Sequence, residues 1–315
     1  MFTWLASYLN SPICSQLGGL LTGIMLRPPY DTSKKNMPNY SVFGDTSLFS
    51  KNNNKSEQTE EQKNTVLITG AGRGIGYALV ERYLKEGWKV IACHHVSGQE
   101  LGLKSLAQKL PGHLETHQLD VTNQSQIKNL SSILRNIKID VLVSNAGKYG
   151  PTAPSGDPTF SKSQPLGKLL TFDKNKCLDV FATNVLGSLW VAEAFVEQVS
   201  ASEKKTIVFI SSRFGSMHED VPRGHYIYSA SKAALNKIMK DLSIELIGRG
   251  ITTFSIHPGW VRTDMGEIHA PLSAEASAQG VYEFINSHTR ETIGCFASID
   301  MENKNHSTKV SYLGL

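Results

Sequence analysis

The amino-acid sequence predicts a doubly wound α/β domain, in which helices cover both faces of a parallel sheet. Two observations support this fold class. From residue 65 onward, short apolar runs alternate with amphipathic segments of about 10–20 residues, the pattern of successive βαβ units. The runs are continuously apolar, as expected for strands that are buried on both faces. With 40% hydrophobic and 19% charged residues, the 315-residue chain has the composition of a soluble globular protein.

The first expected strand is the run TVLIT at 65–69. The segment GYALVERYLKEG at 76–87 follows, with apolar residues at helical spacing and a glycine at its end, so it predicts the first helix. The alternation then continues to residue 256. It predicts strands at 89–93, 114–119, 139–144, 206–211 and 251–256, and helices at 124–136, 176–199 and 228–248.

Residues 1–62 are predicted to be a partly disordered N-terminal extension, separate from a single domain at 63–315. The first 26 residues carry no charged side chain and are apolar in patches, whereas residues 27–64 are polar and rich in proline and asparagine. The apolar patches match a membrane-spanning helix, a secretory signal or a transit peptide poorly. Weak membrane contact or organelle targeting through residues 1–26 stays open beside a loose extension.

Charge and cysteine content exclude several kinds of protein. The net charge of +4 is small and spread along the chain, which argues against a nucleic-acid partner. The four cysteines lie far apart without a C-x-x-C pair, so we expect reduced thiols and a cytoplasmic location. No metal site is predicted, because His113 and His117 flank an expected strand, where such a pair is about 13 Å apart.

The glycine-rich stretch TGAGRGIG at 69–76 lies between the first strand and the first helix. Glycines allow a tight turn and a close approach of the backbone to a pyrophosphate, and the helix N-terminus supplies free N–H groups. This context indicates a dinucleotide site and a Rossmann-type domain. The candidate cofactor-binding residues of this loop are Thr69, Gly70, Arg73, Gly74, Ile75 and Gly76.

The choice of cofactor is indicated by charge. A site for NAD usually has an acidic residue at the end of the second strand, but here that strand ends ACHHVSGQ, with no acid before Glu100. Arg73 can bind the 2′-phosphate as a fixed cation. His94 and His95 could add hydrogen bonds. We therefore expect NADP(H), with NAD(H) as the alternative.

Several motifs in sequence order resemble those of the short-chain dehydrogenase/reductase family over residues 65–270. After TGAGRGIG they are LDVT (119–122), SNAG (144–147), FATNVLG (181–187), VFISS (208–212), YSASK (228–232) and HPGWVRTDMG (257–266). The resemblance implies that Asp120 and Val121 contact the adenine and that Thr263 binds the nicotinamide carboxamide. It also implies cofactor contacts at Asn145, Ala146, Gly147, Pro258, Gly259 and Val261.

The sequence looks most similar to the C-factor-like carbonyl-reductase branch of this family, with two departures. That branch often has an arginine after the second strand, where this chain has His94 and His95. It also often ends in a short aromatic-capped hairpin, which the segment CFASIDMENKNHSTKVSYLGL at 295–315 matches poorly. Because of this second departure, the resemblance predicts neither the outer rim of the pocket nor the oligomeric state.

The candidate catalytic residues centre on Tyr228 and Lys232, which lie four residues apart and therefore on one helix face. The lysine ammonium, together with an oxidised nicotinamide, would favour the tyrosine phenolate. Tyr30 and Lys34 have the same spacing but lie in the polar linker, so they are set aside. Lys232 could also hold the nicotinamide ribose, so both residues are expected at the cofactor as well.

Ser212 and Asn184 complete the predicted site. The resemblance places a serine about 13 residues before the tyrosine, which here is Gly215, so Ser212 and Ser216 are both candidates. We favour Ser212 because it closes a strand, where ligands bind a doubly wound sheet. The resemblance implies that Asn184 holds a water linking Lys232 to solvent.

These residues predict an NADP(H)-dependent oxidoreductase that interconverts a carbonyl and an alcohol of a small molecule. One alternative is a cofactor-binding regulatory or signalling protein that needs no turnover. A second is a membrane-attached dehydrogenase of lipid-like alcohols, held through residues 1–26. The loop at 266–275 is expected to cover the pocket, and the helices at 176–199 and 228–248 could form a homodimer or homotetramer.

Overall fold

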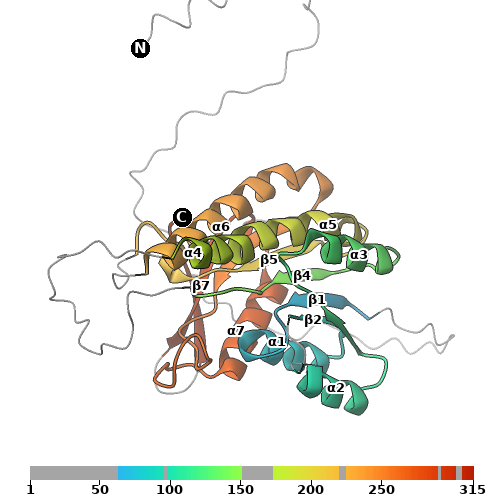
Figure 1. Cartoon of the computed structure of the whole chain (residues 1–315). Coiled ribbons are helices and arrows are strands. Elements are labelled where there is room, and N and C mark those ends of the chain that lie inside the picture. Colours follow the sequence, from blue (N-terminus) through green and yellow to red (C-terminus); the bar gives the residue numbers. More distant parts are fainter. Residues whose placement is uncertain are drawn as a thin grey trace, which may run out of the picture. The chain divides into compact units, whose positions relative to one another are not determined.

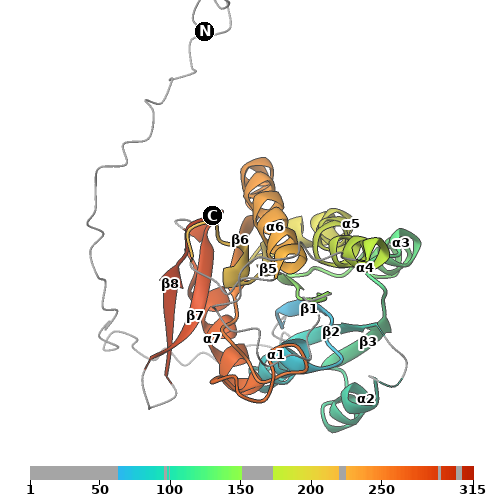
Figure 2. The same cartoon turned by 60° about the vertical axis from the view of Figure 1, so that its left-hand side comes forward.

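The computed structural model describes residues 63–95, 98, 100–150, 173–219, 225–289, 292–302 and 307–315. The described chain contains an eight-stranded sheet in the order β3-β2-β1-β4-β5-β6-β7-β8 (Figure 1 and Figure 2). All neighbours are parallel except β7 and β8. The strands are β1 (Thr65–Thr69), β2 (Lys89–His94), β3 (Leu114–Gln118), β4 (Val141–Ser144), β5 (Thr206–Ile210), β6 (Thr252–His257), β7 (Phe296–Glu302) and β8 (Ser307–Tyr312).

Helices cover the sheet on both sides (Figure 2). They are α1 (Gly74–Lys85), α2 (Glu100–Lys109), α3 (Gln124–Ile133), α4 (Lys174–Phe181), α5 (Ser188–Ser200), α6 (Tyr226–Glu245) and α7 (Ala274–Ser287). One apolar core lies beneath α1 and α7 and includes Tyr83 and Phe254. The other lies beneath α3, α5 and α6 and includes Phe195 and Phe209. The predicted doubly wound parallel sheet is confirmed.

The helix expected at 176–199 is longer and less regular than predicted. It runs from Lys174 to Ser200, and its middle turn, Ala182–Gly187, is π-helical. A π-helical turn inserts an extra residue and often marks a functional site. Of the described residues, this helical segment alone is long and apolar enough to cross a membrane. Half of its most apolar window is buried, and α5 packs on β4 and α3, so packing within the domain accounts for its composition.

The chain end was expected to match a short hairpin poorly. In the structure β7 extends the parallel sheet beside β6, and β8 pairs antiparallel with β7. Strand β7 buries Phe296, Ala297 and Ile299 in the core. The Tyr312 ring lies 6.4 Å from that of Phe284 on α7.

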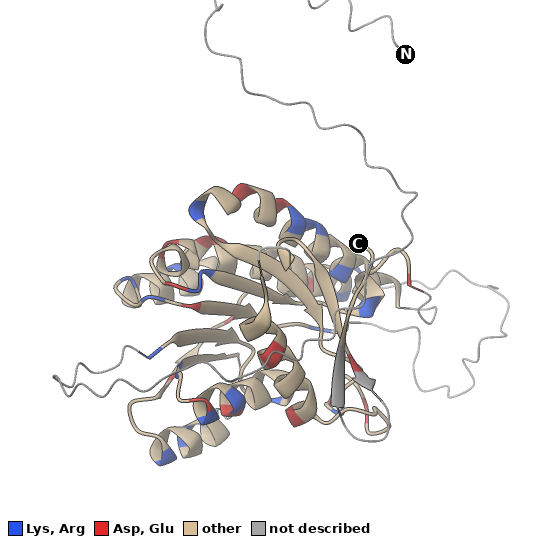
Figure 3. Cartoon of the chain, turned by 180° about the vertical axis from the view of Figure 1, so that it is seen from behind, with Lys and Arg blue, Asp and Glu red and all other residues tan. Residues whose placement is uncertain are grey.

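The remaining differences are small. α2 and α7 were not predicted, and α7 begins within the loop expected at 266–275, where the Ser273 hydroxyl accepts a hydrogen bond from Ala276 N–H and caps the helix. Basic and acidic residues are mixed along the helices (Figure 3), in keeping with the small net charge. Cys93, Cys177 and Cys295 are free thiols. The predicted extension, residues 1–62, and the proposed membrane contact lie outside the described residues.

The position of the site follows from strand order. The sheet starts in the middle at β1 and extends one way through β2 and β3, and the other way through β4 to β7. The connections that leave β1 and β4 therefore run in opposite directions. Ligands bind parallel sheets in the crevice at such a switch point, outside the carboxyl ends of the strands.

Candidate active site

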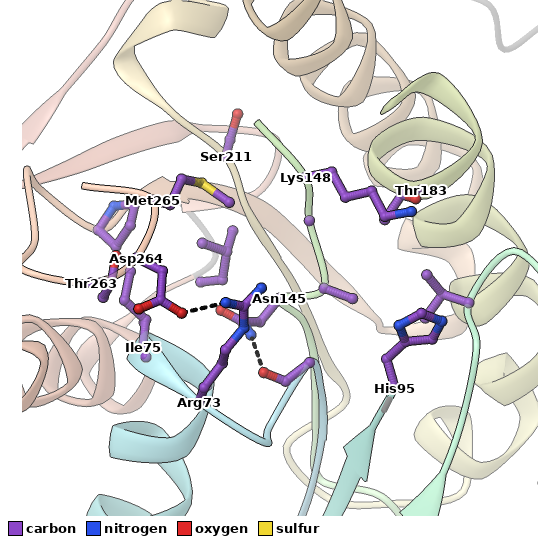
Figure 4. Close-up of a pocket in the computed structure, with 18 of the residues that line it drawn as sticks. Arg73, Ile75, His95, Asn145, Lys148, Thr183, Ser211, Thr263, Asp264 and Met265 are labelled. Carbon is purple, nitrogen blue, oxygen red and sulfur yellow. Dashed lines mark hydrogen bonds and ion pairs between the residues drawn. The ribbon is translucent and has the colours of Figure 1, made fainter. Parts of the chain in front are cut away.

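A pocket of about 450 Å³ opens at the carboxyl ends of the central strands (Figure 4). This volume is typical of a small-molecule or cofactor site. The residues that line it come from the glycine loop, from the segments after β2, β3, β4 and β5, from the helical segments and from the loop after β6. They are Gly70, Arg73, Gly74, Ile75, Gly76, His95, Leu119, Asp120, Val121, Asn145, Ala146, Gly147, Lys148, Thr183, Ile210, Ser211, Tyr228, Lys232, Pro258, Arg262, Thr263, Asp264 and Met265.

The glycine loop forms the floor of the pocket at its β1 end. Gly70 has a φ of +65°, and a Cβ there would lie 2.8 Å from the Cα of Ala146, so only glycine fits. The loop is fastened from beneath by Asn145, whose Nδ2 donates to the carbonyls of Thr69 and Gly70 at 2.9 and 3.1 Å. Thr69 itself is fully buried, and its hydroxyl oxygen accepts from the N–H groups of Asn145 and Ala146. Thr69 therefore shapes the loop and does not line the pocket.

The N-terminus of α1 points at the pocket through Gly74, Ile75 and Gly76. No side chain caps this helix end, and its first turn contains no acidic residue. The N–H groups and the positive end of the helix dipole are thus available to an anion. This arrangement fits the pyrophosphate of a dinucleotide.

The end of the second strand requires a correction. His94 is the last residue of β2 and is buried, with 6% of its surface exposed, and it is not part of the pocket lining. The histidine at the pocket is His95, whose Nε2 lies 3.5 Å from a carboxylate oxygen of Asp120. Successive side chains of an extended chain point in opposite directions, so only one of the two neighbouring histidines faces the pocket.

Two charged pairs stand at the outer part of the pocket. The Arg73 guanidinium is paired with the carboxylate of Asp264, as Figure 4 shows, and both side chains are largely exposed. Partial burial raises the pKa of Asp120, but hydrogen bonds from Thr122 and the proximity of His95 outweigh it, and the net pKa is lowered. The sequence did not predict these two pairs. Asp264 belongs to the motif HPGWVRTDMG, in which a role was assigned to the neighbouring Thr263 but not to Asp264.

The loop after β6 brings Thr263 to the pocket. Gly259 has a φ of +87°, and Val261 pairs with Leu272 in an isolated bridge. Neither lines the pocket, although both were predicted to bind the cofactor. They shape the loop that carries Pro258 and Thr263, which do line it. Of the apolar residues of this loop, Met265 reaches the pocket, whereas Trp260 and Ile268 are exposed.

Two buried hydroxyl groups in the lining have no partner. Of the described residues, Ser211 and Thr183 each contribute a pocket-lining hydroxyl oxygen that is buried and lacks a hydrogen bond. A buried polar group without a partner costs about 1–3 kcal/mol. A nicotinamide ribose or amide, which carries both donors and acceptors, would supply the partners, so the residues present fit a nicotinamide dinucleotide. Sequence reasoning missed both hydroxyls, although they adjoin Ser212 and Asn184.

Tyr228 and Lys232 lie side by side at the inner end of the pocket, on α6. Burial raises the pKa of Tyr228 to about 12, while a hydrogen bond with Ser212 acts in the opposite direction. Burial also lowers the pKa of Lys232 to about 8. The Lys232 ammonium lies 5.8 Å from the centre of the Tyr228 ring and donates to the carbonyl of Ile210 at 2.8 Å. Without a bound cofactor, burial therefore outweighs the expected effect of the lysine, and Tyr228 keeps its proton at neutral pH.

The two serine candidates have different partners. The Ser212 hydroxyl acts on Tyr228, whose pKa it lowers, and accepts a hydrogen bond from Phe214 N–H at 3.3 Å. The Ser216 hydroxyl instead donates to the carbonyl of Gly314 at 2.6 Å and accepts from His218 N–H. The structure thus brings Ser212 to the tyrosine and directs Ser216 toward the hairpin.

Asn184 is fully buried in the π-helical turn, next to the pocket but not in its lining. Its Oδ1 accepts from Lys148 N–H at 2.7 Å, and its Nδ2 donates to the Lys148 carbonyl at 2.8 Å and to the Ser231 hydroxyl at 3.0 Å. In this arrangement the amide fastens the segment after β4 to α6.

The sequence and the fold are similar to those of known oxidoreductases. The family model for short chain dehydrogenases matches residues 64–271. An uncharacterised oxidoreductase of Schizosaccharomyces pombe is 35% identical over 255 residues, covering 74% of this chain and 94% of that protein. The C-signal of Myxococcus xanthus is 32% identical over 158 residues, covering 50% of this chain and 87% of that protein. The NADPH-bound carbonyl reductase from chicken fatty liver has a TM-score of 0.64 and 25% identity, covering 75% of this chain and 96% of that chain.

Proposed function

Because this chain belongs to the short-chain dehydrogenase family of NAD(P)-dependent oxidoreductases, we propose that it reduces the carbonyl group of a small molecule with NADPH. The family membership predicted from the sequence motifs is confirmed. The observation that carries the proposed reaction is the buried Tyr228 side chain at the pocket, beside Lys232 and within the influence of the Ser212 hydroxyl, which lowers its pKa. The similarity to an NADPH-bound carbonyl reductase supports both the reaction and the cofactor.

We propose that the cofactor is held along the length of the pocket. The glycine loop and the N-terminus of α1 bind its pyrophosphate, and Asp120 and Val121 contact its adenine. Asn145, Ala146, Gly147, Pro258, Thr263 and Lys232 hold its nicotinamide half. When bound, the cofactor supplies the hydride for the carbonyl carbon.

The residues of the chain supply the proton and the stabilisation of charge. Tyr228 is protonated at neutral pH, since burial raises its pKa to about 12, so it can donate to the carbonyl oxygen. The Ser212 hydroxyl, which acts on Tyr228, can donate to the same oxygen as negative charge develops on it. The Lys232 ammonium stabilises the phenolate that remains after proton donation.

The kcat/KM for carbonyl reduction is expected to be constant below about pH 8 and to fall above it. Burial lowers the pKa of Lys232 to about 8 and raises that of Tyr228 to about 12. Between these values Tyr228 keeps the proton that it must donate, whereas Lys232 loses the charge that favours its release. The measurement is kcat/KM for a reactive ketone across this range. A rate that stays level well above pH 8 would contradict the role given to Lys232.

The preference for NADPH is expected to depend on Arg73. Replacing Arg73 by alanine should weaken NADPH binding by about 10- to 100-fold, the effect of one charge-assisted hydrogen bond, and should change NADH binding little. Both dissociation constants are measured by cofactor fluorescence. The matched control is Asp264→Asn, which frees Arg73 from its present ion pair and should leave NADPH binding unchanged or slightly tighter. Equal losses for NADPH and NADH in the Arg73 variant would refute this assignment.

We also infer that residues 63–315 form one catalytic domain of a cytoplasmic enzyme. A homodimer through α4, the π-helical turn and α6 is supported by exposed apolar side chains on these segments, namely Leu178, Leu186 and Ile244. The substrate class is to be found by screening aldehydes, ketones and alcohols for changes in NADPH absorbance. If the enzyme turns over none of these compounds, the proposed reaction is wrong.

A further inference from the structure

Three segments that are far apart in the sequence meet around the Tyr228 ring. Tyr149 follows β4, Phe214 lies in the short helical turn after β5 (Arg213–Gly215), and His225 directly precedes α6. The Tyr149 and Tyr228 rings are 4.6 Å apart, and the Phe214 and Tyr228 rings are 6.0 Å apart. Phe214 also packs edge-on against His225 at 4.8 Å. We call Tyr149, Phe214 and His225 the aromatic cluster.

The hydroxyl of Tyr149 is held by a specific partner. It lies 2.9 Å from Nδ1 of His225. Burial lowers the pKa of His225, which favours the neutral imidazole, and a neutral ring nitrogen can accept a hydrogen bond from the Tyr149 hydroxyl. The His225 side chain does not cap α6, although the residue occupies the N-cap position. Its polar contact is therefore with Tyr149 rather than with the helix end.

The backbone on either side of Tyr149 is also fixed. The preceding residue, Lys148, is bonded at both N–H and carbonyl by the buried amide of Asn184, and its ammonium is paired with Asp179 at 2.7 Å. The following residue, Gly150, has a φ of +79°, and a Cβ there would collide with Val180. A rigid segment thus presents Tyr149 to Tyr228.

We propose that Tyr149 and His225 are a positioning pair for Tyr228, a role that rests on the proposed function. Tyr228 must place its hydroxyl within hydrogen-bond reach of a carbonyl oxygen, and small displacements of a reacting group are costly. The Lys232 ammonium lies 5.8 Å from the centre of the Tyr228 ring, the Ser212 hydroxyl lowers the pKa of Tyr228, and the Tyr149 ring packs against the Tyr228 ring. The hydrogen bond to His225 fixes Tyr149. Phe214 packs against His225 and donates its N–H to the Ser212 hydroxyl, so it joins the pair to Ser212.

The pair acts through Tyr228, so its loss should change turnover and not cofactor binding. Tyr149→Phe keeps the ring and removes the hydrogen bond, and His225→Leu removes the acceptor. Each is expected to lower kcat by about 3- to 10-fold, the effect of one hydrogen bond, with the dissociation constant of NADPH unchanged. The double variant should be no slower than either single variant, because both remove the same contact.

A conservative replacement separates positioning from general damage. His225→Asn is expected to restore most of kcat, because the asparagine amide oxygen can occupy the place of Nδ1 and accept from Tyr149. The matched control is Tyr282→Phe, which removes a tyrosine hydroxyl on α7, the helix that covers the other core, and should leave kcat unchanged. Wild-type kcat in both single variants, or losses that multiply in the double variant, would overturn the pairing.

A second measurement does not depend on turnover. Thermal unfolding of Tyr149→Leu, Tyr228→Leu and the double variant should give non-additive changes in stability, because each ring supports the other. Additive changes would show that the rings do not support each other and would overturn the proposed positioning. Absence of reductase activity in the wild-type enzyme would instead refute the proposed function, so the two failures are distinct.

Discussion

Replacing Tyr228 by phenylalanine is expected to lower the rate of carbonyl reduction by about 100- to 10,000-fold, the contribution of a positioned general acid. The substitution removes the only atom of the residue that can carry the proton, and it leaves the ring. Tyr228 is 8% exposed and packs between Tyr149 and Phe214, so the phenylalanine ring should occupy the same place. The NADPH dissociation constant should therefore change little.

The measurements are single-turnover reduction and NADPH fluorescence titration on the same preparation. The matched control is Tyr226→Phe, since Tyr226 lies two residues earlier on α6 and is 49% exposed. Substantial turnover by the Tyr228 variant would exclude this residue as the proton donor. A variant without turnover that keeps full biological activity would favour the alternative of a regulatory or signalling protein.

Replacing Ser212 by alanine is expected to lower kcat by about 100- to 1,000-fold, the effect of removing one donor to a developing oxyanion. Ser212 is 5% exposed, and its hydroxyl lowers the pKa of Tyr228, so the substitution also removes this effect on the tyrosine. The Tyr228 hydroxyl should then release its proton less readily.

Ser216→Ala is the matched control for this prediction. Its hydroxyl donates to the Gly314 carbonyl, so its loss should cost about 0.5–1.5 kcal/mol of stability and little turnover. Both variants are compared by kcat and by the free energy of unfolding. Near-normal turnover in the Ser212 variant together with an inactive Ser216 variant would reverse the assignment of the serine.

Sequence reasoning succeeded where a function depends on local structure. The Tyr228–Lys232 pair shares a helix face because helical geometry places residues four apart on one side. The glycine loop lies at the start of α1 because strand, loop and helix are consecutive in the chain. The same reasoning gave little for β7 and β8, because β7 is stabilised by pairing with the distant strand β6 and by contacts such as that of Arg213 with Asp300 at 2.6 Å.

The amino-acid sequence by itself determined the class of fold, the family, and the place of the cofactor loop and the tyrosine–lysine pair, because each depends on residues a few positions apart. The tertiary structure alone decided which serine meets the tyrosine and which histidine faces the pocket. It also decided that Tyr149 supports Tyr228. The Ser216 hydroxyl is turned away by a carbonyl 98 residues later, and Tyr149 is held by a histidine 76 residues later. The direction of a side chain depends on such distant partners, which periodicity and spacing do not contain.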